Sequence, residues 1–340
     1  MIPLRNLLGH KYYAVSYLQF CESRGTTDKI VQKNLRDLRS SIEYKPVVFI
    51  DWEHELVLKY QTNYNFLGFK EILGKYYDTN RWAISVPTFG HMNYGARQIN
   101  NLDFLIYVNS FNKDYNPGLI DHSNKKKDFL YLNGKPHPFR VFLMKELMDN
   151  DLLTNSVWSA NSSYHSWTNY QQKLPVDYEW PEWRGKIVDG YDDTTRKVYH
   201  PMYNDTICSI VPETLAYNDC HYITEKTCKP LMAEHLFVIL SGAGFLKNLR
   251  NLGFKTFHEH FDESYDDCLN LHDRIQKIVS TLKQIKNMDA DALYKDTVPI
   301  RRHNRELFFN NKFYEKFNTN QVKRLESFFA RTNVQESLDQ

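Results

Sequence analysis

An acid and a base stand side by side in the segment HYITEKTCKPL, in which Glu225 and Lys226 follow Thr224. A carboxylate can accept hydrogen bonds from two adjacent ribose hydroxyls, and an ammonium group can neutralise phosphate oxygens, so the pair suits a nucleotide. A glutamate in a first helical turn beside an exposed lysine is also common on ordinary helices. Taken alone, the pair favours this second, structural interpretation, and the surrounding residues must decide.

Pro230 bears on where the helix of this segment begins. Proline lacks an N–H group and is tolerated in the first turn of a helix. The sequence therefore predicts a helix that begins near Cys228. Glu225 and Lys226 would then lie on the preceding loop, where both side chains can face a ligand.

Further polar residues and glycines follow the strands expected in the second half of the chain. In an open parallel sheet, ligands bind beyond the carboxyl ends of the strands, where helix N-termini offer N–H groups. Cations and glycine-rich turns suit a diphosphate there, and a nearby carboxylate suits a ribose. The predicted donor-binding residues are Asn133, Gly134, Lys135, Arg140, Glu213, Thr224, Glu225, Lys226, Lys229, Gly242 and Gly244.

A catalytic base is expected from the first half of the chain. Asp51 and Glu53, with Glu55 close behind, follow the predicted strand VVFI, and His91 follows SVPTFG. Each can equally be a surface residue, since loops near a cleft are rich in such side chains. Asp51, Glu53 and His91 are therefore candidates for the base, and the sequence does not choose among them.

No metal site is predicted. The triplets Asp149-Asn-Asp151 and Asp289-Ala-Asp291 fall in or beside expected helices, and we interpret both as structural. The string FHEHFDESYDD resembles a set of metal ligands, but it is more typical of a polar loop beside a strand. The cations named above, with the backbone amides near Gly242, would instead neutralise a leaving phosphate.

Alternating strands and helices must position these residues. In the first half, VVFI, RWAISVP and LDFLIYVNSF read as strands, and DKIVQKNLRDLRSSIE and NFLGFKEILGKYY read as helices. The polar stretch 112–128 contains Pro and Gly with little to bury. It predicts a domain boundary.

The second half repeats the alternation. Strands are expected at 129–132, in TICSIV, in LFVIL and in KTF, and helices at FRVFLMKEL, after Thr224, at FLKNLRNLG and over about 266–285. Strands regularly separated by helices predict a mostly parallel sheet covered on both faces. Two such units in tandem predict a pair of Rossmann-like domains with a cleft between them.

Composition narrows the class of protein. The 340 residues carry 43 basic and 41 acidic side chains, a net charge of +2, so the molecule as a whole would not hold a polyanion. No apolar run of about 18 residues occurs, which predicts no membrane span. The odd number of cysteines without CxxC spacing predicts reduced thiols and a cytoplasmic location. These are Cys21, Cys208, Cys220, Cys228 and Cys268.

HYITEKTCKPL followed by LFVILSGAGFLKNLRNLGF resembles the donor-binding segment of GT-B glycosyltransferases of the fucosyltransferase-like kind. The longer string from YLNGKPHPFRVFLMKEL through VPET and TEKTCKPL to RRHNRELFF is similar to glycosyltransferase-like proteins of phages and marine viruses. Some relatives of that group are thought to modify hydroxymethylated bases in DNA. The resemblance covers roughly residues 129–309 and is most specific in the Thr-Glu-Lys segment.

This resemblance implies a GT-B fold: two Rossmann-like domains facing a central cleft, with a C-terminal helix crossing back to the first domain. The expected domains are 1–120 on the acceptor side, 126–295 on the donor side, and C-terminal helices at 296–340. The implied activity is metal-independent transfer of a hexose from a nucleotide sugar, with no cofactor. The Lys-Pro after the motif departs from the fucosyltransferase pattern, which speaks against GDP-fucose as the donor. A UDP-sugar such as UDP-glucose is the expected co-substrate, but the residues themselves identify neither the sugar nor the base.

Two acceptors remain open, a glycan and a 5-hydroxymethylated pyrimidine such as 5-hydroxymethylcytosine in phage DNA. The aromatic stretch 158–183 could stack on an extruded base. The net charge of +2 speaks against DNA unless basic residues converge. The residues considered for such a surface are Arg81, Arg97, Lys113, Lys125, Lys126, Lys127, Arg184, Lys186, Arg301 and Arg302. A non-catalytic nucleotide-sugar-binding protein or a virion interaction protein on the same fold is the alternative function. The sequence does not predict an oligomeric state.

Overall fold

The structure is a computed structural model, and it describes a defined part of the chain. The described residues are 13–16, 37–38, 40, 42, 47–50, 82–86, 88–89, 98–100, 102–112, 120–123, 125–134, 136–160, 187–188, 191–192, 198, 200–216 and 221–336. The chain divides into two compact units. Unit 1 comprises Met1–Tyr107 and Asn311–Gln340, and unit 2 comprises Val108–Asn310. Each is described by itself.

Unit 1 contains a four-stranded parallel sheet in the order β1-β2-β3-β5. Its strands are β1 (Tyr13–Ser16), β2 (Val47–Ile50), β3 (Trp82–Val86) and β5 (Gln98–Asn100), and β4 (Thr88–Phe89) follows β3. The strands predicted in VVFI and RWAISVP are confirmed as β2 and β3.

The last helix of the chain, α13 (Asn311–Glu336), belongs to the core of unit 1. Leu325 and Phe329 of α13 form one buried cluster with Val48 of β2 and Ala83 of β3. In addition, the Asn100 backbone N–H donates to Gln321 Oε1 at 3.3 Å. The C-terminal segment therefore covers a sheet whose strands lie more than 200 residues earlier in the chain.

The segment LDFLIYVNSF was predicted as a strand, and this prediction is wrong. It forms helix α6 (Asp103–Phe111). The buried side chains Leu102, Leu105, Ile106 and Asn109 recur at helical spacing, and Asn109 Nδ2 donates to the Phe308 carbonyl at 2.8 Å. A short apolar run has no polar alternation, so periodicity could not separate a buried helix from a buried strand.

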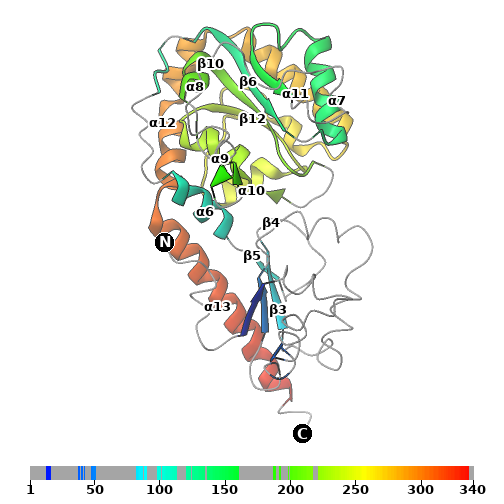
Figure 1. Ribbon diagram of the computed structural model, residues 1–340, viewed down its shortest axis with the longest axis vertical. Helices are drawn as coiled ribbons and strands as arrows, with labels where there is room; N and C mark the ends of the chain where they lie inside the picture. Colours follow the sequence, from blue (N-terminus) through cyan, green and yellow to red (C-terminus); the bar gives the residue numbers. More distant parts are fainter. Residues whose placement is uncertain are drawn as a thin grey trace. The chain divides into compact units, whose positions relative to one another are not determined.

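Unit 2 is built on a second four-stranded parallel sheet, in the order β12-β10-β6-β7 (Figure 1). The strands are β6 (Lys127–Asn133), β7 (Val157–Ala160), β10 (Thr206–Pro212) and β12 (Leu236–Leu240). All five residues of β12 are buried, as expected for a strand covered on both faces. The parallel α/β character predicted from the alternation of elements is confirmed.

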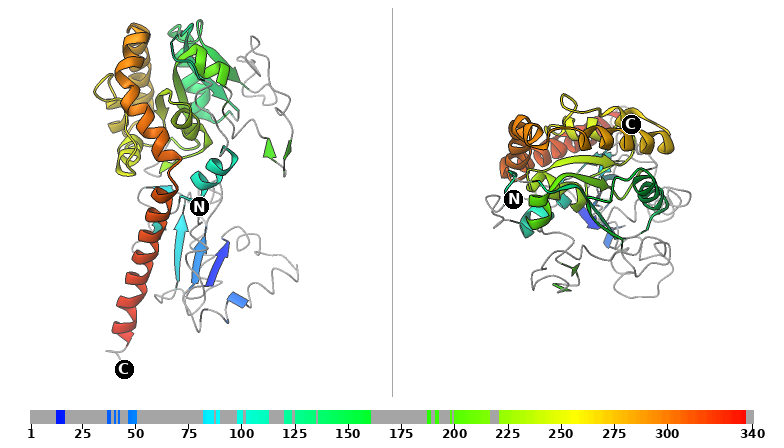
Figure 2. Two further views of the ribbon diagram at one scale, coloured as in Figure 1. Left: turned by 90° about the vertical axis from the view of Figure 1, so that its left-hand side faces the viewer. Right: turned by 90° about the horizontal axis from the view of Figure 1, so that it is seen from above.

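Helices pack against this sheet, and Figure 2 shows it edge-on between them. They are α7 (Pro138–Asp149), α8 (His200–Asp205), α9 (Glu225–Met232), α10 (Phe245–Asn251), α11 (Leu271–Lys286) and α12 (Ala290–Phe308). α9 contacts β10, β12 and α12, and α11 contacts β12 and α7. The short elements β8 (Ile187–Val188), β9 (Tyr191–Asp192), β11 (His221–Tyr222) and the 3-10 helix η7 (Ser264–Asp267) complete the unit.

The strand predicted in KTF does not form, although Phe254 and Phe257 are buried. Side chains replace the backbone partners that a neighbouring strand would supply. The Lys255 N–H donates to Asn304 Oδ1 at 2.7 Å, and Asn304 Nδ2 donates to the Lys255 carbonyl at 2.9 Å. The Phe257 N–H donates to Glu263 Oε1 at 2.7 Å.

The helix predicted from about residue 266 begins later, at Leu271. Asn270 caps it, because its side-chain oxygen accepts from the His272 and Asp273 N–H groups at 2.8 and 3.2 Å. Among the helices that the structure describes, none combines the length and apolar character needed to cross a membrane.

Candidate functional site

Glu213 is the centre of the polar residues that follow the carboxyl ends of β6, β10 and β12, here called the carboxyl edge. It comes directly after β10, and its side chain is fully buried. Oε1 accepts from the Thr224 N–H at 3.0 Å and from Thr227 Oγ1 at 2.5 Å. Oε2 accepts from Thr224 Oγ1 at 2.6 Å and from the Thr214 N–H at 3.1 Å.

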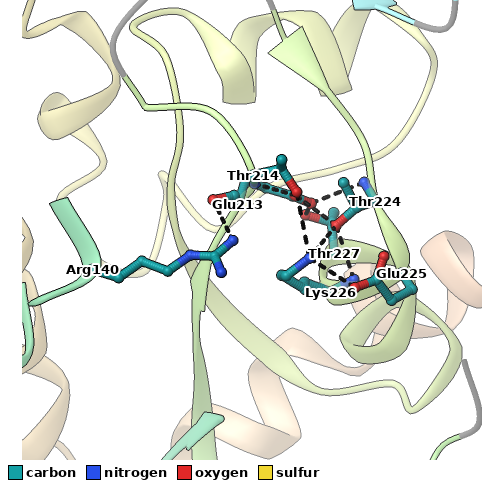
Figure 3. Close-up of polar contacts among 7 residues, drawn as sticks. All are labelled: Arg140, Glu213, Thr214, Thr224, Glu225, Lys226 and Thr227. Carbon is teal, nitrogen blue, oxygen red and sulfur yellow. Dashed lines mark hydrogen bonds and ion pairs between the residues drawn. The ribbon is translucent and has the colours of Figure 1, made fainter. Parts of the chain in front are cut away.

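These four hydrogen bonds decide the role of Glu213. Its oxygens serve the chain itself, so the carboxylate holds the Thr224–Thr227 segment in place (Figure 3). Glu213 was predicted as a donor-binding residue, and here it supports the residues that would do the binding. Its support is expected to be strong, because hydrogen bonds to a charged acceptor are about twice as strong as neutral ones.

The Thr-Glu-Lys segment is the first turn of α9 and not a loop. Thr224 is the N-cap, and its hydroxyl oxygen accepts from the Lys226 N–H at 3.2 Å. The expectation that the helix begins near Cys228 is therefore wrong by three residues. Pro230 lies inside the helix, and the bonds from Glu213 fix the turn that precedes it.

Glu225 and Lys226 form an ion pair at this helix start, with Lys226 Nζ 2.7 Å from Glu225 Oε1. Lys226 Nζ also lies 3.4 Å from the hydroxyls of Thr214 and Thr224. The side chains of Lys226 and Glu225 are 27% and 20% exposed, so both remain accessible to a ligand. Burial alone would raise the pKa of Glu225, but Lys226 and Lys229 outweigh it and lower that pKa to about 2.

Arg140 reaches the same point from α7. Its side chain is buried at 3% exposure, and Nη2 donates to the Glu213 carbonyl at 3.0 Å (Figure 3). The Arg140 guanidinium thus lies beside the segment that holds Lys226. Direct contact between Arg140 and a phosphate stays a prediction.

Asn133 ends β6 with its amide buried at 5% exposure. The Tyr131 hydroxyl lies nearby, but it donates to the Arg140 carbonyl at 3.2 Å. Neither Oδ1 nor Nδ2 of Asn133 makes a hydrogen bond of ordinary geometry with a described residue. Next to it, a Cβ on Gly134 would meet no atom within 4 Å. A buried amide whose hydrogen bonds are incomplete costs about 1–3 kcal/mol, so a ligand that pairs with the Asn133 side chain would gain binding energy.

The glycine-containing turn 242–244 before α10 lies beside the side chain of Asp266. Asp266 accepts from the Leu246 and Lys247 N–H groups at 2.9 and 3.0 Å, and its carbonyl accepts from the Gly244 N–H at 2.7 Å. The Phe245 N–H donates to the Gly242 carbonyl at 3.2 Å. A phosphate at these amides would have to displace the Asp266 carboxylate.

The φ angle of 82° at Gly244 explains why a glycine stands at this position. His221 also braces the turn. Its Nε2 lies 2.8 Å from the Ala243 carbonyl, which places the proton on Nε2, and its Nδ1 contacts the Asn248 side-chain amide.

Arg274 was not among the predicted site residues, yet its guanidinium lies at the carboxyl edge. It donates to the carbonyls of Ala216, after β10, and of Ser241, after β12. A signal was present in the sequence, because Arg274 shares the buried stripe of α11 with Ile278 and Leu282. A cation at an apolar position of a helix needs a buried partner.

Several predicted residues lie outside the described part of the chain, namely Asp51, Glu53, His91 and Lys135. The catalytic base therefore stays a prediction. The Asp-x-Asp triplets lie at helix ends: Asp149 is the last residue of α7, and Asp289 caps α12 by accepting from the Ala292 N–H at 3.0 Å. Among the described residues, no group of three or more His, Cys, Asp or Glu side chains could hold a metal ion.

Two residues considered for a DNA-binding surface are engaged elsewhere. Arg301 is 3% exposed and donates to Thr297 Oγ1 and to the carbonyls of Glu234 and Tyr294. Lys125 donates to the Tyr203 carbonyl at 2.7 Å. Lys126 and Arg302 are exposed, Lys127 is half-buried, and the other five residues lie outside the described ranges.

A scan against models of protein families gives no match for this chain, and a search of curated proteins gives none either.

Proposed function

We propose that unit 2 binds a nucleoside-diphosphate sugar at the carboxyl edge and that the protein is a metal-independent glycosyltransferase. The observation that carries the proposal is the arrangement around Glu213. One buried carboxylate fixes a helix start from which an ionised acid and a lysine, both partly exposed, project together. Such pre-ordering reduces the entropy that ligand binding costs.

The roles follow from the chemistry of each group. Glu225, ionised because Lys226 and Lys229 hold its pKa at about 2, would accept from the ribose hydroxyls. Lys226 would exchange its contact with Glu225 for the diphosphate oxygens. Asn133 supplies a buried donor and acceptor that a ligand could pair with.

In the proposed reaction, the bond between the anomeric carbon and the diphosphate oxygen breaks as the acceptor oxygen bonds to that carbon. Negative charge builds on the leaving diphosphate, and Lys226 would stabilise it. The acceptor proton would pass to a base in unit 1, for which Asp51, Glu53 and His91 are the candidates. A GT-B arrangement of the two units is part of this proposal.

The acceptor remains divided between a glycan and hydroxymethylated DNA. The burial of Arg301 removes one cation from the possible DNA surface. The described residues do not choose between the two acceptors. Assays with hydroxymethylcytosine-containing duplex and with oligosaccharides distinguish the two.

The test is release of nucleoside diphosphate from a panel of UDP- and GDP-sugars, with and without acceptors. Lys226→Ala should lose about 2–4 kcal/mol of transition-state stabilisation, a fall of roughly 30- to 1000-fold in kcat/KM. Folding should change little, since Lys226 is partly exposed. Lys277→Ala, on the exposed side of α11, is the control and should keep full activity.

Full activity of Lys226→Ala would contradict the proposed site. If the protein binds a nucleotide sugar but turns none over with any acceptor, it is a binding protein on this fold.

A further inference from the structure

Arg274 makes an unusual set of contacts for a buried cation. It lies in the first turn of α11 and is 2% exposed. Nη1 donates to the Ala216 and Ser241 carbonyls at 2.8 and 2.5 Å. Nε and Nη2 donate to the Cys268 carbonyl at 2.9 and 2.6 Å, and Nη2 also reaches the Leu269 carbonyl at 3.2 Å. Every one of these acceptors is a backbone oxygen.

The carbonyls belong to segments that are distant in sequence. Ala216 lies in the described segment 213–216, which begins with Glu213 after β10, and Ser241 opens the loop 241–244 after β12. We call these two segments the edge loops. Cys268 and Leu269 follow η7. One planar group therefore joins both edge loops to the start of α11.

Other bonds join the edge loops at the same place. Ser241 Oγ donates to the Leu215 carbonyl at 2.9 Å, and the Glu213 N–H donates to the Leu240 carbonyl at 2.9 Å. The backbone of Glu213 is thus tied to β12 on one side and to Arg140 on the other. Any change in the spacing of the edge loops would move the Glu213 carboxylate, and with it Thr224, Glu225 and Lys226.

We propose that Arg274 is the positioning residue of this site: it sets the spacing of the edge loops and so fixes the geometry with which Glu225 and Lys226 meet a nucleotide. This rests on the proposed function. Arg274 itself need not touch the ligand, because its guanidinium is buried and faces carbonyls.

Lysine cannot replace arginine in this role. Its single ammonium group has no rigid fork, and it cannot bond in-plane to carbonyls from three segments at once. Arg274→Lys keeps the charge and loses the bridging geometry. The variant therefore separates positioning from simple electrostatic attraction.

Arg301 provides a matched control, because it is a second buried arginine that donates to backbone carbonyls. It is 3% exposed and bonds the carbonyls of Glu234 and Tyr294, before β12 and on α12. Arg301→Lys should lower the thermal stability as Arg274→Lys does. Arg301, however, lies at the ends of the strands opposite the edge loops, so its replacement should leave the spacing of these loops unchanged.

The experiment measures binding of uridine diphosphate and guanosine diphosphate by calorimetry, after circular dichroism has shown each variant to be folded. Arg274→Lys should weaken binding of the nucleotide preferred by the wild type by about tenfold or more, and Arg301→Lys by less than about twofold. In turnover, Arg274→Lys should raise KM for the donor and also lower kcat, because Glu225 and Lys226 are both displaced.

If Arg274→Lys fails to fold, Ser241→Ala replaces it as the test variant. It removes only the hydroxyl bond between the edge loops and should weaken nucleotide binding by a few-fold. Wild-type affinity in the folded Arg274→Lys variant, or in Ser241→Ala when that variant replaces it, would overturn the positioning role. An equal loss in Arg301→Lys would overturn it as well. If the wild type binds neither nucleotide, the proposed function fails, which is a separate result.

Discussion

The two ends of the sheet in unit 2 shift the pKa values of their side chains to different effect: one end favours the charged form of an acid, and the other favours the neutral form of bases. At the carboxyl edge, Lys226 and Lys229 keep Glu225 ionised, with a pKa of about 2. At the other end, here called the amino edge, burial lowers the pKa values of basic side chains and so favours their neutral forms. Burial, with the nearby charge of Lys125, lowers the pKa of His122 to about 3, and burial with Arg301 lowers that of Lys125 to about 7.

The amino edge is an aromatic cluster around Tyr294. Lys125 Nζ and Arg301 Cζ lie 4.5 and 4.4 Å from the centre of its ring, and His122 stacks on it at 5.1 Å. His235 is buried there, with Nδ1 2.9 Å from Ser209 Oγ and Nε2 2.8 Å from the Thr206 carbonyl.

The difference between the edges supports the proposal that a ligand binds at the carboxyl edge. A charged pair that stays partly exposed can exchange its partner for a ligand, whereas bases whose neutral form is favoured by burial contribute to packing. Substitutions at the carboxyl edge should therefore change nucleotide binding. Matched substitutions at the amino edge should change only stability.

The largest effect is expected for Glu213→Gln. Glu213 is fully buried, and its carboxylate accepts four hydrogen bonds. In the variant, the new NH2 group would face donors from which the carboxylate now accepts. Unfolding should become easier by about 2–4 kcal/mol, and nucleotide binding should fall below detection. Calorimetric unfolding and nucleotide titration measure the two effects.

Ser209→Ala, in the middle of β10, is the comparison for the amino edge, because Ser209 contacts His235 there. It removes the bond to His235 and should cost about 1 kcal/mol of stability with no change in nucleotide affinity. Equal loss of affinity in both variants would mean that the two edges do not differ in function.

The next largest effect is expected in the pH dependence of stability that arises at the amino edge, and Lys125→Met tests it. The folded pKa of Lys125, about 7, lies below its ordinary 10.5, so between these values the unfolded chain keeps a proton that the folded chain has released. Wild-type stability should therefore rise with pH across this window. Relative to Lys125→Met, the wild type should gain about 1–3 kcal/mol between about pH 6 and about pH 9.5.

Lys126→Met, one residue further and exposed, controls for the loss of a positive charge and should show no such gain. Nucleotide affinity at constant pH should be the same in all three proteins. A flat difference between wild type and Lys125→Met across the window would show that Lys125 stays charged in the cluster.

The sequence predicted β6, β10 and β12 because each is a short apolar run between polar segments, but it did not predict β7. It mistook α6 for a strand for the same reason, since the centre of LDFLIYVNSF is the continuous apolar run FLIYV. The strand expected in KTF fails because Asn304 and Glu263, 49 and 6 residues away in sequence, take its backbone hydrogen bonds. The residues of KTF themselves do not predict these partners.

For the candidate site, residue types pointed to the correct strand ends but not to the roles of the residues. Glu213 supports the Thr-Glu-Lys turn, and Asp266 occupies the amides before α10. Both roles depend on tertiary contacts between separate loops. Arg274 could have been noticed as a cation on the apolar face of a helix, although its acceptors could not.

The smallest change in stability, and the most specific test of the carboxyl edge, is expected for Glu225→Gln. The folded pKa of about 2 lies below the ordinary 4.5, so the contribution of Glu225 to stability is present above pH 4.5 and is lost as the pH falls towards 2. The variant should lose this dependence. At neutral pH the cost should be only about 0–1 kcal/mol, because the ion pair is partly exposed.

Binding reveals more than stability at this position. If Glu225 accepts from both ribose hydroxyls, Glu225→Gln should weaken uridine diphosphate about tenfold and 2′-deoxyuridine diphosphate by a clearly smaller factor, since the deoxy compound lacks one of the two hydroxyls. The guanosine pair of nucleotides takes their place if the wild type prefers guanosine diphosphate. Equal weakening of both members of the pair would instead show that Glu225 acts through Lys226, by orienting the ammonium group towards the phosphates. In that case the carboxyl edge recognises the diphosphate alone, and its contrast with the amino edge rests on Lys226.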